Sequence, residues 1–187
     1  MLKDLILKNR SYRRFDESRE IDREVLLELV DLARLSASGA NMQSVRFYLS
    51  NGQEENNAIN ECLKWAGYLK GWSPAEGERA TAFIVMLKDK ERKSSTAYDE
   101  GIAAQSILLG AAEKGLGGCM LGAVDREKLH AVLGLDEKYE ILLVVALGYP
   151  CETVVIEEAK DNDIKYWRSE DGVHHVPKRS LDELIVN

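Results

Sequence analysis

The sequence predicts an α/β or α+β fold in which one sheet is flanked by helices, because helical and strand patterns alternate along the chain. Three observations carry this prediction: an amphipathic helical pattern that begins at Asp22, a continuous apolar run at 82–87, and an Ala- and Leu-rich segment from Tyr98 to Lys114. The 187 residues contain only three prolines and no repeat, so we expect residues 1–187 to form one domain.

Residues 1–8 are expected to form a short helix. Asp22 can cap a second helix, whose apolar positions recur at helical spacing: Val25, Leu26, Leu29, Val30 and Ala33. VRFYLS at 45–50 alternates as strands do. A helical pattern returns over 54–69, and the Gly- and Pro-containing segment 70–79 is expected to be a loop.

In the second half, 82–87 reads as a buried strand and 98–114 as a helix that is buried on most of its surface. The glycines of GLGGCMLG, residues 115–122, are expected to end that helix and to form a turn. Three elements then follow: a helix that Asp125 caps and that runs to Leu133, a strand at 141–150 that ends in a Gly-Tyr-Pro turn, and a terminal helix that starts at the Ser180–Glu183 capping box.

Composition excludes several classes of protein. The formal net charge of −7 argues against a general nucleic-acid binder, which needs a broad basic face. The chain has no run of 18 apolar residues and no signal-peptide pattern at its start, so we expect a cytoplasmic protein without a membrane span. Cys62, Cys119 and Cys151 are expected to be unpaired buried thiols, and the adjacent pair His174-His175 lacks a third metal ligand at a recognisable spacing.

The stretch NRSYRRF, residues 9–15, gathers positive charge inside this acidic chain. The guanidinium groups of Arg10 and Arg13, with the Ser11 hydroxyl between them, suit the acceptor oxygens of a phosphate. The alternative is a solvated basic loop that forms surface ion pairs, and Arg14 is expected to be such an ordinary surface charge.

Two further segments carry polar groups that could bind a ligand. In SASGANMQ, residues 36–43, the side chains of Ser38, Asn41 and Gln43 suit a planar heterocycle with alternating N–H and C=O edges; the alternative is a polar turn between helix and strand. The glycines of 115–122 let a ligand approach backbone N–H groups, although they fit neither a dinucleotide fingerprint nor a P-loop, and a helix C-cap is the alternative.

Trp65, Tyr68 and Trp72 form an aromatic cluster that could pack into the core or a dimer contact, or could serve as a stacking wall. By themselves, Lys178 and Arg179 indicate only a solvated basic loop before the last helix.

The order of these motifs, however, resembles the nitroreductase family. R-S-x-R-x-F, an amphipathic helix, S-x-x-N-x-Q, a G-L-G-G turn and a strand closing in G-Y-P follow one another from Asn9 to Arg179. The resemblance implies an oxidoreductase dependent on flavin mononucleotide (FMN). It also implies an α+β sandwich with a central, mostly antiparallel sheet, which forms an intertwined homodimer with two FMN sites at the interface.

The resemblance also assigns roles to residues on both sides of the flavin. Arg10, Ser11 and Arg13 match the segment that holds the phosphate and reaches along the ribityl chain to the pyrimidine edge, and Lys178 and Arg179 match basic residues that close over the phosphate. A second set matches the segment that the partner subunit packs on the ring: Ser38, Asn41 and Gln43. A third set matches a turn whose backbone N–H groups face flavin N5 and O4: Met120, Leu121 and Gly122.

The activity implied is a ping-pong transfer of hydride from NAD(P)H to an electron-poor small molecule such as a nitroaromatic or a quinone. The chain shows no convincing pair of nucleophile and base, which fits an enzyme whose cofactor carries the chemistry, so no side chain is expected to be catalytic. Arg13 and Lys70 are candidates for a cation near flavin N1. Two alternatives stay open: a sibling specialised in dehalogenation or flavin breakdown, and a flavin-binding protein without turnover.

Two departures from the family pattern concern the site. Many members have a basic residue where this chain has Asn9, which affects the number of phosphate contacts. The common Ala-Pro-Ser and Gln-Pro-Trp sequences appear here as Ser36-Ala37-Ser38 and Gln43-Ser44-Val45, so the wall that packs on the ring is expected to differ.

Overall fold

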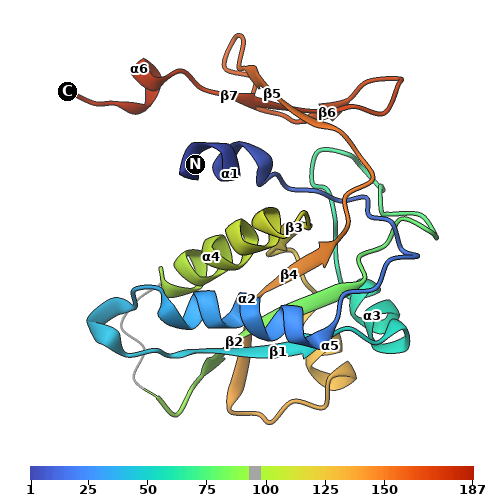
Figure 1. The fold of residues 1–187 in the computed structure, drawn as a ribbon, viewed down its shortest axis with the longest axis vertical. Helices are drawn as coiled ribbons and strands as arrows, with labels where there is room; N and C mark the ends of the chain where they lie inside the picture. Colours follow the sequence, from blue (N-terminus) through green and yellow to red (C-terminus); the bar gives the residue numbers. More distant parts are fainter. Residues whose placement is uncertain (93–97) are drawn as a thin grey trace.

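A four-stranded antiparallel sheet forms the centre of the protein in a computed structural model that describes residues 1–92 and 98–187 (Figure 1). Its strands lie in the order β1 (Val45–Ser50), β2 (Ala82–Asp89), β4 (Tyr139–Gly148) and β3 (Gly117–Leu121). All three neighbouring pairs run antiparallel, which confirms the expected α+β class with an antiparallel central sheet.

Strand β2 is buried on both faces, as its continuous apolar sequence predicts. Ala82, Ile84 and Met86 pack in one cluster with α2 (Arg23–Leu35) and α4 (Asp99–Glu113). The alternate residues, such as Phe83 and Val85, pack in a second cluster with α3 (Gln53–Asn60) and α5 (Arg126–Val132). Two helices therefore cover each face of the sheet.

A second, three-stranded sheet follows the core in sequence. Its strands are β5 (Val154–Glu158), β7 (His174–Lys178) and β6 (Trp167–Arg168), with β5 and β7 parallel. Figure 1 shows this C-terminal sheet on the far side of α1 (Leu2–Lys8) from the main sheet, with α6 (Leu181–Leu184) beside it near the C-terminus. The capping box of Ser180 and Glu183 is present, as is the cap of Asp125 on α5.

The structure corrects two elements expected from the sequence. The helix expected over 54–69 ends at Asn60, because the backbone beyond it bonds to another segment: Lys64 N–H donates to the Ala123 carbonyl at 2.9 Å, and Leu63 forms a bridge with Val124. The glycine-rich turn expected at 115–122 is mostly strand β3. The three short strands between 154 and 178 have no counterpart among the elements predicted from sequence.

Close packing, not turn geometry, explains the glycine at position 118. A Cβ atom placed there would lie 2.5 Å from Leu108 Cδ2 and 2.7 Å from the Ala146 carbonyl oxygen, so any side chain would force α4 or β4 away. Among the glycines of residues 115–122, only Gly115, which follows α4, has the left-handed φ (76°) that a turn requires.

We expect Gly118→Ala to lower the free energy of unfolding by about 1–3 kcal/mol, the usual cost of overpacking. Gly101 is the matched control, because a Cβ there meets nothing within 4 Å. Since Gly101 lies inside α4, Gly101→Ala should raise stability by up to about 1 kcal/mol through helix propensity. Urea denaturation of both variants measures this, and equal effects of the two substitutions would contradict the packing argument.

Within residues 1–92 and 98–187, no helix is both long enough and apolar enough to cross a bilayer.

Candidate functional site

A cavity of about 290 Å³ lies where the N-terminal segment, α4, β3 and the C-terminal sheet meet. Five residues singled out in the sequence line it: Arg10, Ser11, Arg13, Met120 and Lys178. Asn9 also lines it, and its side-chain amide reaches Gln105 Oε1 at 3.5 Å. The structure thus brings together groups that lie more than 160 residues apart in the sequence.

The cavity wall is positively charged. It contains Arg10, Arg13 and Lys178, whereas none of the described residues that line it is an aspartate or glutamate. Arg10 donates from Nη2 to the Ile6 carbonyl in α1, while its buried Nε has no partner among the described residues. In a chain with a net charge of −7, such a wall favours an anionic ligand.

Arg13 is buried and fixed in place. Its Nε donates to the Trp65 carbonyl at 2.9 Å and its Nη1 to the Ser11 carbonyl at 3.2 Å. The alternative of a solvated loop is therefore wrong for this residue. Arg14, expected to be an ordinary surface charge, instead forms a half-buried ion pair with Glu78.

Glu152 anchors the arginine segment to the C-terminal sheet. Its side chain is fully buried, and it accepts the backbone N–H groups of Arg13 and Arg14 while it forms an ion pair with Arg168 at 2.6 Å. Arg168 in turn lies over the Trp72 ring at 4.3 Å. Sequence reasoning missed Glu152, because no local pattern marks a carboxylate whose partners are this far away.

Strand β3 lies at the edge of the central sheet, and Met120 on this strand lines the cavity. Tyr12 N–H donates to the Gly118 carbonyl at 3.1 Å, so the backbone groups of Gly118 point away from β4. Since these directions alternate along an antiparallel strand, the N–H of Met120 also points away from β4, whereas that of Leu121 points to β4. Of the three residues predicted to present N–H groups here, Met120 therefore has the best-placed one within the strand.

His174 of β7 and Tyr166, which directly precedes β6, also line the wall, and sequence reasoning assigned neither of them to the site. His174 is fully buried, and its Nε2 lies 3.3 Å from Arg13 Nη1. Because arginine only donates hydrogen bonds, His174 must be neutral and must accept at Nε2. Burial, followed by the positive charge of Arg13, lowers the pKa of His174 from 6.5 to about 4.

This lowered pKa predicts a loss of stability in acid. As the pH falls from 6.5 towards 4, His174 binds a proton in the unfolded chain but not in the folded one, so unfolding is favoured. The loss should reach about 3 kcal/mol near pH 4. In urea denaturation across this pH range, His174→Gln should lack the loss of stability that protonation of His174 causes. Parallel curves of stability against pH for the wild type and the variant would contradict the lowered pKa of His174.

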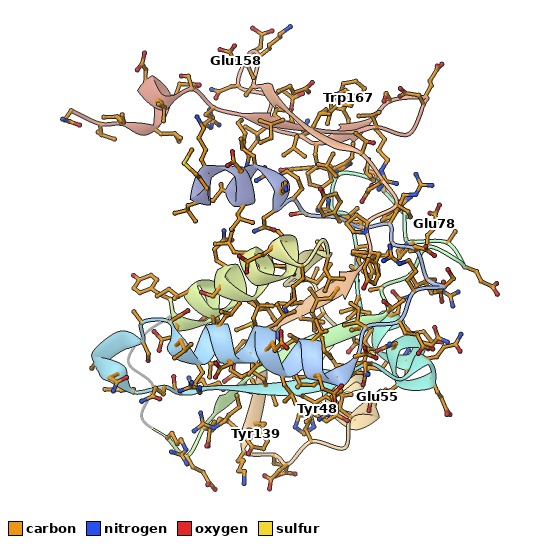
Figure 2. All side chains as sticks on the ribbon, viewed as in Figure 1. Tyr48, Glu55, Glu78, Tyr139, Glu158 and Trp167 are labelled. Carbon is orange, nitrogen blue, oxygen red and sulfur yellow. The ribbon has the colours of Figure 1, made fainter. Side chains whose placement is uncertain are left out.

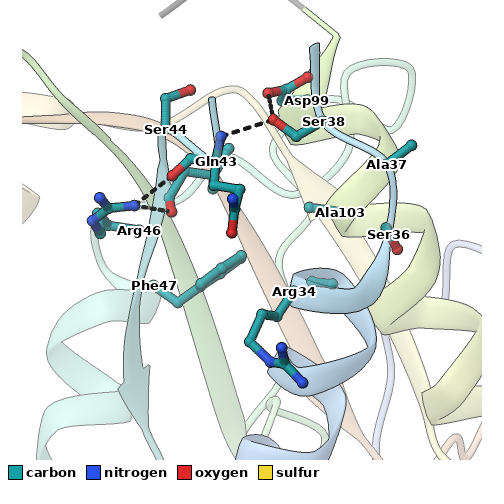
Figure 3. Close-up of a pocket in the computed structure, with 12 residues that line it drawn as sticks. Arg34, Ser36, Ala37, Ser38, Gln43, Ser44, Arg46, Phe47, Asp99 and Ala103 are labelled. Carbon is teal, nitrogen blue, oxygen red and sulfur yellow. Dashed lines mark hydrogen bonds between the residues drawn. The ribbon is translucent and has the colours of Figure 1, made fainter. Parts of the chain in front are cut away.

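Ser38 and Gln43 line a different cavity, of about 150 Å³, between α2, β1 and α4 (Figure 3). Ser38 Oγ donates to the buried Asp99 at 2.7 Å and accepts the Gln43 N–H at 2.9 Å. Ala40, Asn41 and Gln43 adopt left-handed φ angles of 47°, 53° and 48°, a strained backbone of the kind that concentrates at functional sites. No described residue lines both cavities, so one chain does not bring this segment to Arg10.

Other candidate residues lie outside the first cavity. Arg179 donates to Asn162 and to Glu183, and Lys70 is exposed. Leu121 is buried in the core, and Gly122 is exposed beyond the end of β3. None of these four residues lines the first cavity. Arg179 is held by other partners, and the other three lie elsewhere in the fold.

The aromatic cluster divides between core and surface. Trp65 is buried in the core, Trp72 packs against it, and the exposed Tyr68 meets Tyr166 edge to face with ring centroids 4.9 Å apart. The three cysteines are unpaired, as expected. Cys62 and Cys119 are buried, but Cys151 is exposed, so the expectation of a buried thiol is wrong for Cys151.

Other proteins are similar to this chain in sequence and in structure. A protein of Archaeoglobus fulgidus, provisionally named NADH dehydrogenase/NAD(P)H nitroreductase, is 29% identical over 84% of this chain and 90% of its own length. An NADPH-flavin oxidoreductase of Vibrio harveyi is 29% identical over 79% of this chain, which is 65% of that protein. An FMN-dependent nitroreductase structure from Clostridium difficile is 26% identical with a TM-score of 0.65, covering 83% of this chain and 90% of that one. Residues 6–149 match the model of the nitroreductase family.

Proposed function

The chain belongs to the nitroreductase family, and from this premise we propose that it is an FMN-dependent NAD(P)H oxidoreductase. The observation that carries the proposal is the cavity wall with three cations and no acidic residue among its described lining residues. The buried Arg10 Nε, for which the described part of the chain offers no partner, fits an anionic group such as the FMN phosphate. The donor set therefore fits the cofactor that the family uses.

Each side of the cavity has a distinct role in this proposal. Arg10, Ser11 and Lys178 would hold the phosphate, because they combine two cations with a hydroxyl. Arg13 places a fixed positive charge in the wall, which suits the negative charge that a reduced flavin carries. The N–H of Met120, which points away from β4, would donate to the ring edge.

When bound, FMN would supply the hydride chemistry of a ping-pong exchange between NAD(P)H and an electron-poor acceptor, such as a nitroaromatic or a quinone. The protein's part is to bind, to orient and to supply electrostatics, so no side chain is assigned as an acid, a base or a nucleophile. We include the whole chain, residues 1–187, in one FMN-binding domain, because His174 and Lys178 line the same cavity as Arg10.

We also propose a homodimer with FMN at the subunit interface. Ser38, Asn41 and Gln43 can reach the arginine cavity only from a second copy if they share a flavin with it, since within one chain the cavities are separate. Large apolar side chains are exposed on three helices near these segments: Leu2, Ile6 and Leu7 on α1, Leu32 and Leu35 on α2, and Ile102 on α4. A cytoplasmic location is proposed from the unpaired cysteines alone.

The test uses purified protein. It should bind FMN and turn yellow, and anaerobic NADH or NADPH should bleach the flavin bands. Colour without bleaching would favour a flavin-binding protein without turnover, and failure of folded protein to take up FMN would exclude the proposal. Light scattering after gel filtration should give twice the mass of one chain. A screen of acceptors with the reduced enzyme would separate nitro and quinone reduction from dehalogenation or flavin breakdown.

A further inference from the structure

We propose that His174 and Tyr166 are positioning residues that hold the Arg13 guanidinium at the cavity wall, so that the C-terminal sheet controls how tightly the flavin ring is bound. The inference rests on the proposed function, since it concerns the same cavity. Both residues lie outside residues 6–149, the part of the chain that matches the family.

Neutral groups surround the Arg13 guanidinium. Two are backbone carbonyls, those of Trp65 and Ser11, and the third is the Nε2 lone pair of His174 at 3.3 Å. The Tyr166 ring lies against the guanidinium, 4.7 Å from Cζ to the ring centroid. The positive charge is thus fixed in direction without being neutralised.

The nearest buried carboxylate is occupied elsewhere. Glu152 accepts the Arg13 backbone N–H, but its charge is paired with Arg168. Across residues 1–92 and 98–187, no carboxylate forms an ion pair with the Arg13 side chain. Arg13 therefore offers its full charge to a ligand in the cavity, and its neighbours decide where that charge lies.

The C-terminal sheet fixes His174 firmly. Its backbone N–H donates to the Thr153 carbonyl at 2.9 Å, and its ring packs against Tyr166 with centroids 5.3 Å apart. Its buried Nδ1 has no partner among the described residues, although a buried polar atom without a partner costs stability. A role in packing alone does not explain that cost, whereas the need for an acceptor beside Arg13 does.

The adjacent histidine provides a contrast. His175 stacks on Trp167 with centroids 3.9 Å apart and contacts Glu157 at 3.2 Å, and it does not line the cavity. Side chains alternate along a strand, so the two histidines of β7 point to opposite faces. Figure 2 shows Trp167 on the C-terminal sheet, with side chains filling the space between that sheet and α1.

The experiment compares four variants by titrating FMN and riboflavin into flavin-free full-length protein and measuring the quenching of flavin fluorescence. His174→Phe keeps a buried ring but removes the acceptor, so it should weaken both ligands by the same factor, about tenfold or more. His174→Gln should recover most of the affinity, because its amide oxygen can accept from Arg13. His175→Phe should bind both ligands as the wild type does.

Tyr166→Leu removes the ring below the guanidinium and should weaken both ligands by about two- to thirtyfold, as expected for a cation–π contact. Thermal unfolding of every variant identifies any that do not fold. If His174→Phe does not fold, the comparison of His174→Gln with Tyr166→Leu decides, because only the latter should lose affinity.

Three results would overturn the inference. The first is wild-type affinity in both His174→Phe and Tyr166→Leu, and the second is a Gln variant as weak as the Phe variant. The third is a loss for FMN but not for riboflavin, which would place the effect at the phosphate. Failure of the wild type to bind either flavin would instead exclude the proposed function itself, and the inference with it.

Discussion

Replacing Glu152 by alanine is expected to lower the free energy of unfolding by about 3–5 kcal/mol, the usual cost of removing one partner of a buried ion pair. The side chain of Arg168 is only 15% exposed, and its Nε already lacks a partner among the described residues, so its charge would be left buried and unpaired. The backbone N–H groups of Arg13 and Arg14 would lose their acceptor at the same time.

Urea denaturation followed by circular dichroism measures this loss. Glu158→Ala is the matched control, because Glu158 is exposed on β5 of the same sheet and its removal should change stability by less than about 0.5 kcal/mol. A second variant, Glu152→Ala with Arg168→Met, should recover part of the loss, since it removes both charges. A cost below about 1 kcal/mol for Glu152→Ala would show that the ion pair does not anchor the arginine segment.

The second large effect concerns the phosphate. Replacing both Arg10 and Lys178 by alanine should weaken FMN binding by about 10²–10⁴-fold, because each hydrogen bond to a charged group contributes about 1.5–3 kcal/mol. Arg13 stays in place, since its buried guanidinium also holds the fold together. Each single variant should lose about tenfold or more, and the wild-type affinity should fall as salt is added.

Arg179→Ala is the control for the double variant, because Arg179 is the next basic residue along the chain but bonds to Asn162 and Glu183. It should retain FMN as the wild type does. Riboflavin, which lacks the phosphate, should bind the double variant and the wild type with similar affinity. An unchanged FMN affinity in the double variant would return Arg10 and Lys178 to the role of solvated surface charges.

Local patterns predicted most of the central fold. Helix α2 and strand β1 follow from the periodicity of their apolar residues, and strand β2 follows from its continuous apolar run, because each of these signals lies within a few residues. The caps at Asp125 and Ser180 follow from side chains that bond to backbone three residues away. The prediction of a turn at residues 115–122 was mostly wrong. Glycine often indicates a turn, but here Gly118 permits β3 to approach α4 closely.

The candidate site divides in the same way. Arg10, Ser11, Arg13, Met120 and Lys178 could be predicted from motif order and do line one cavity. The residues that support them could not be predicted: Glu152, Tyr166 and His174 have no local sequence pattern, and the arginines that they contact lie 16 to 161 residues away.

The sequence by itself therefore determined the elements whose cause is local, together with the family to which its ordered motifs belong. Only the tertiary structure decided which charges are neutralised and which remain available to a ligand. Arg13, Arg14 and Arg168 are the same residue type, yet one is held by neutral acceptors and two by carboxylates. That difference depends on burial and on contacts between distant segments, which exist only once the chain has folded.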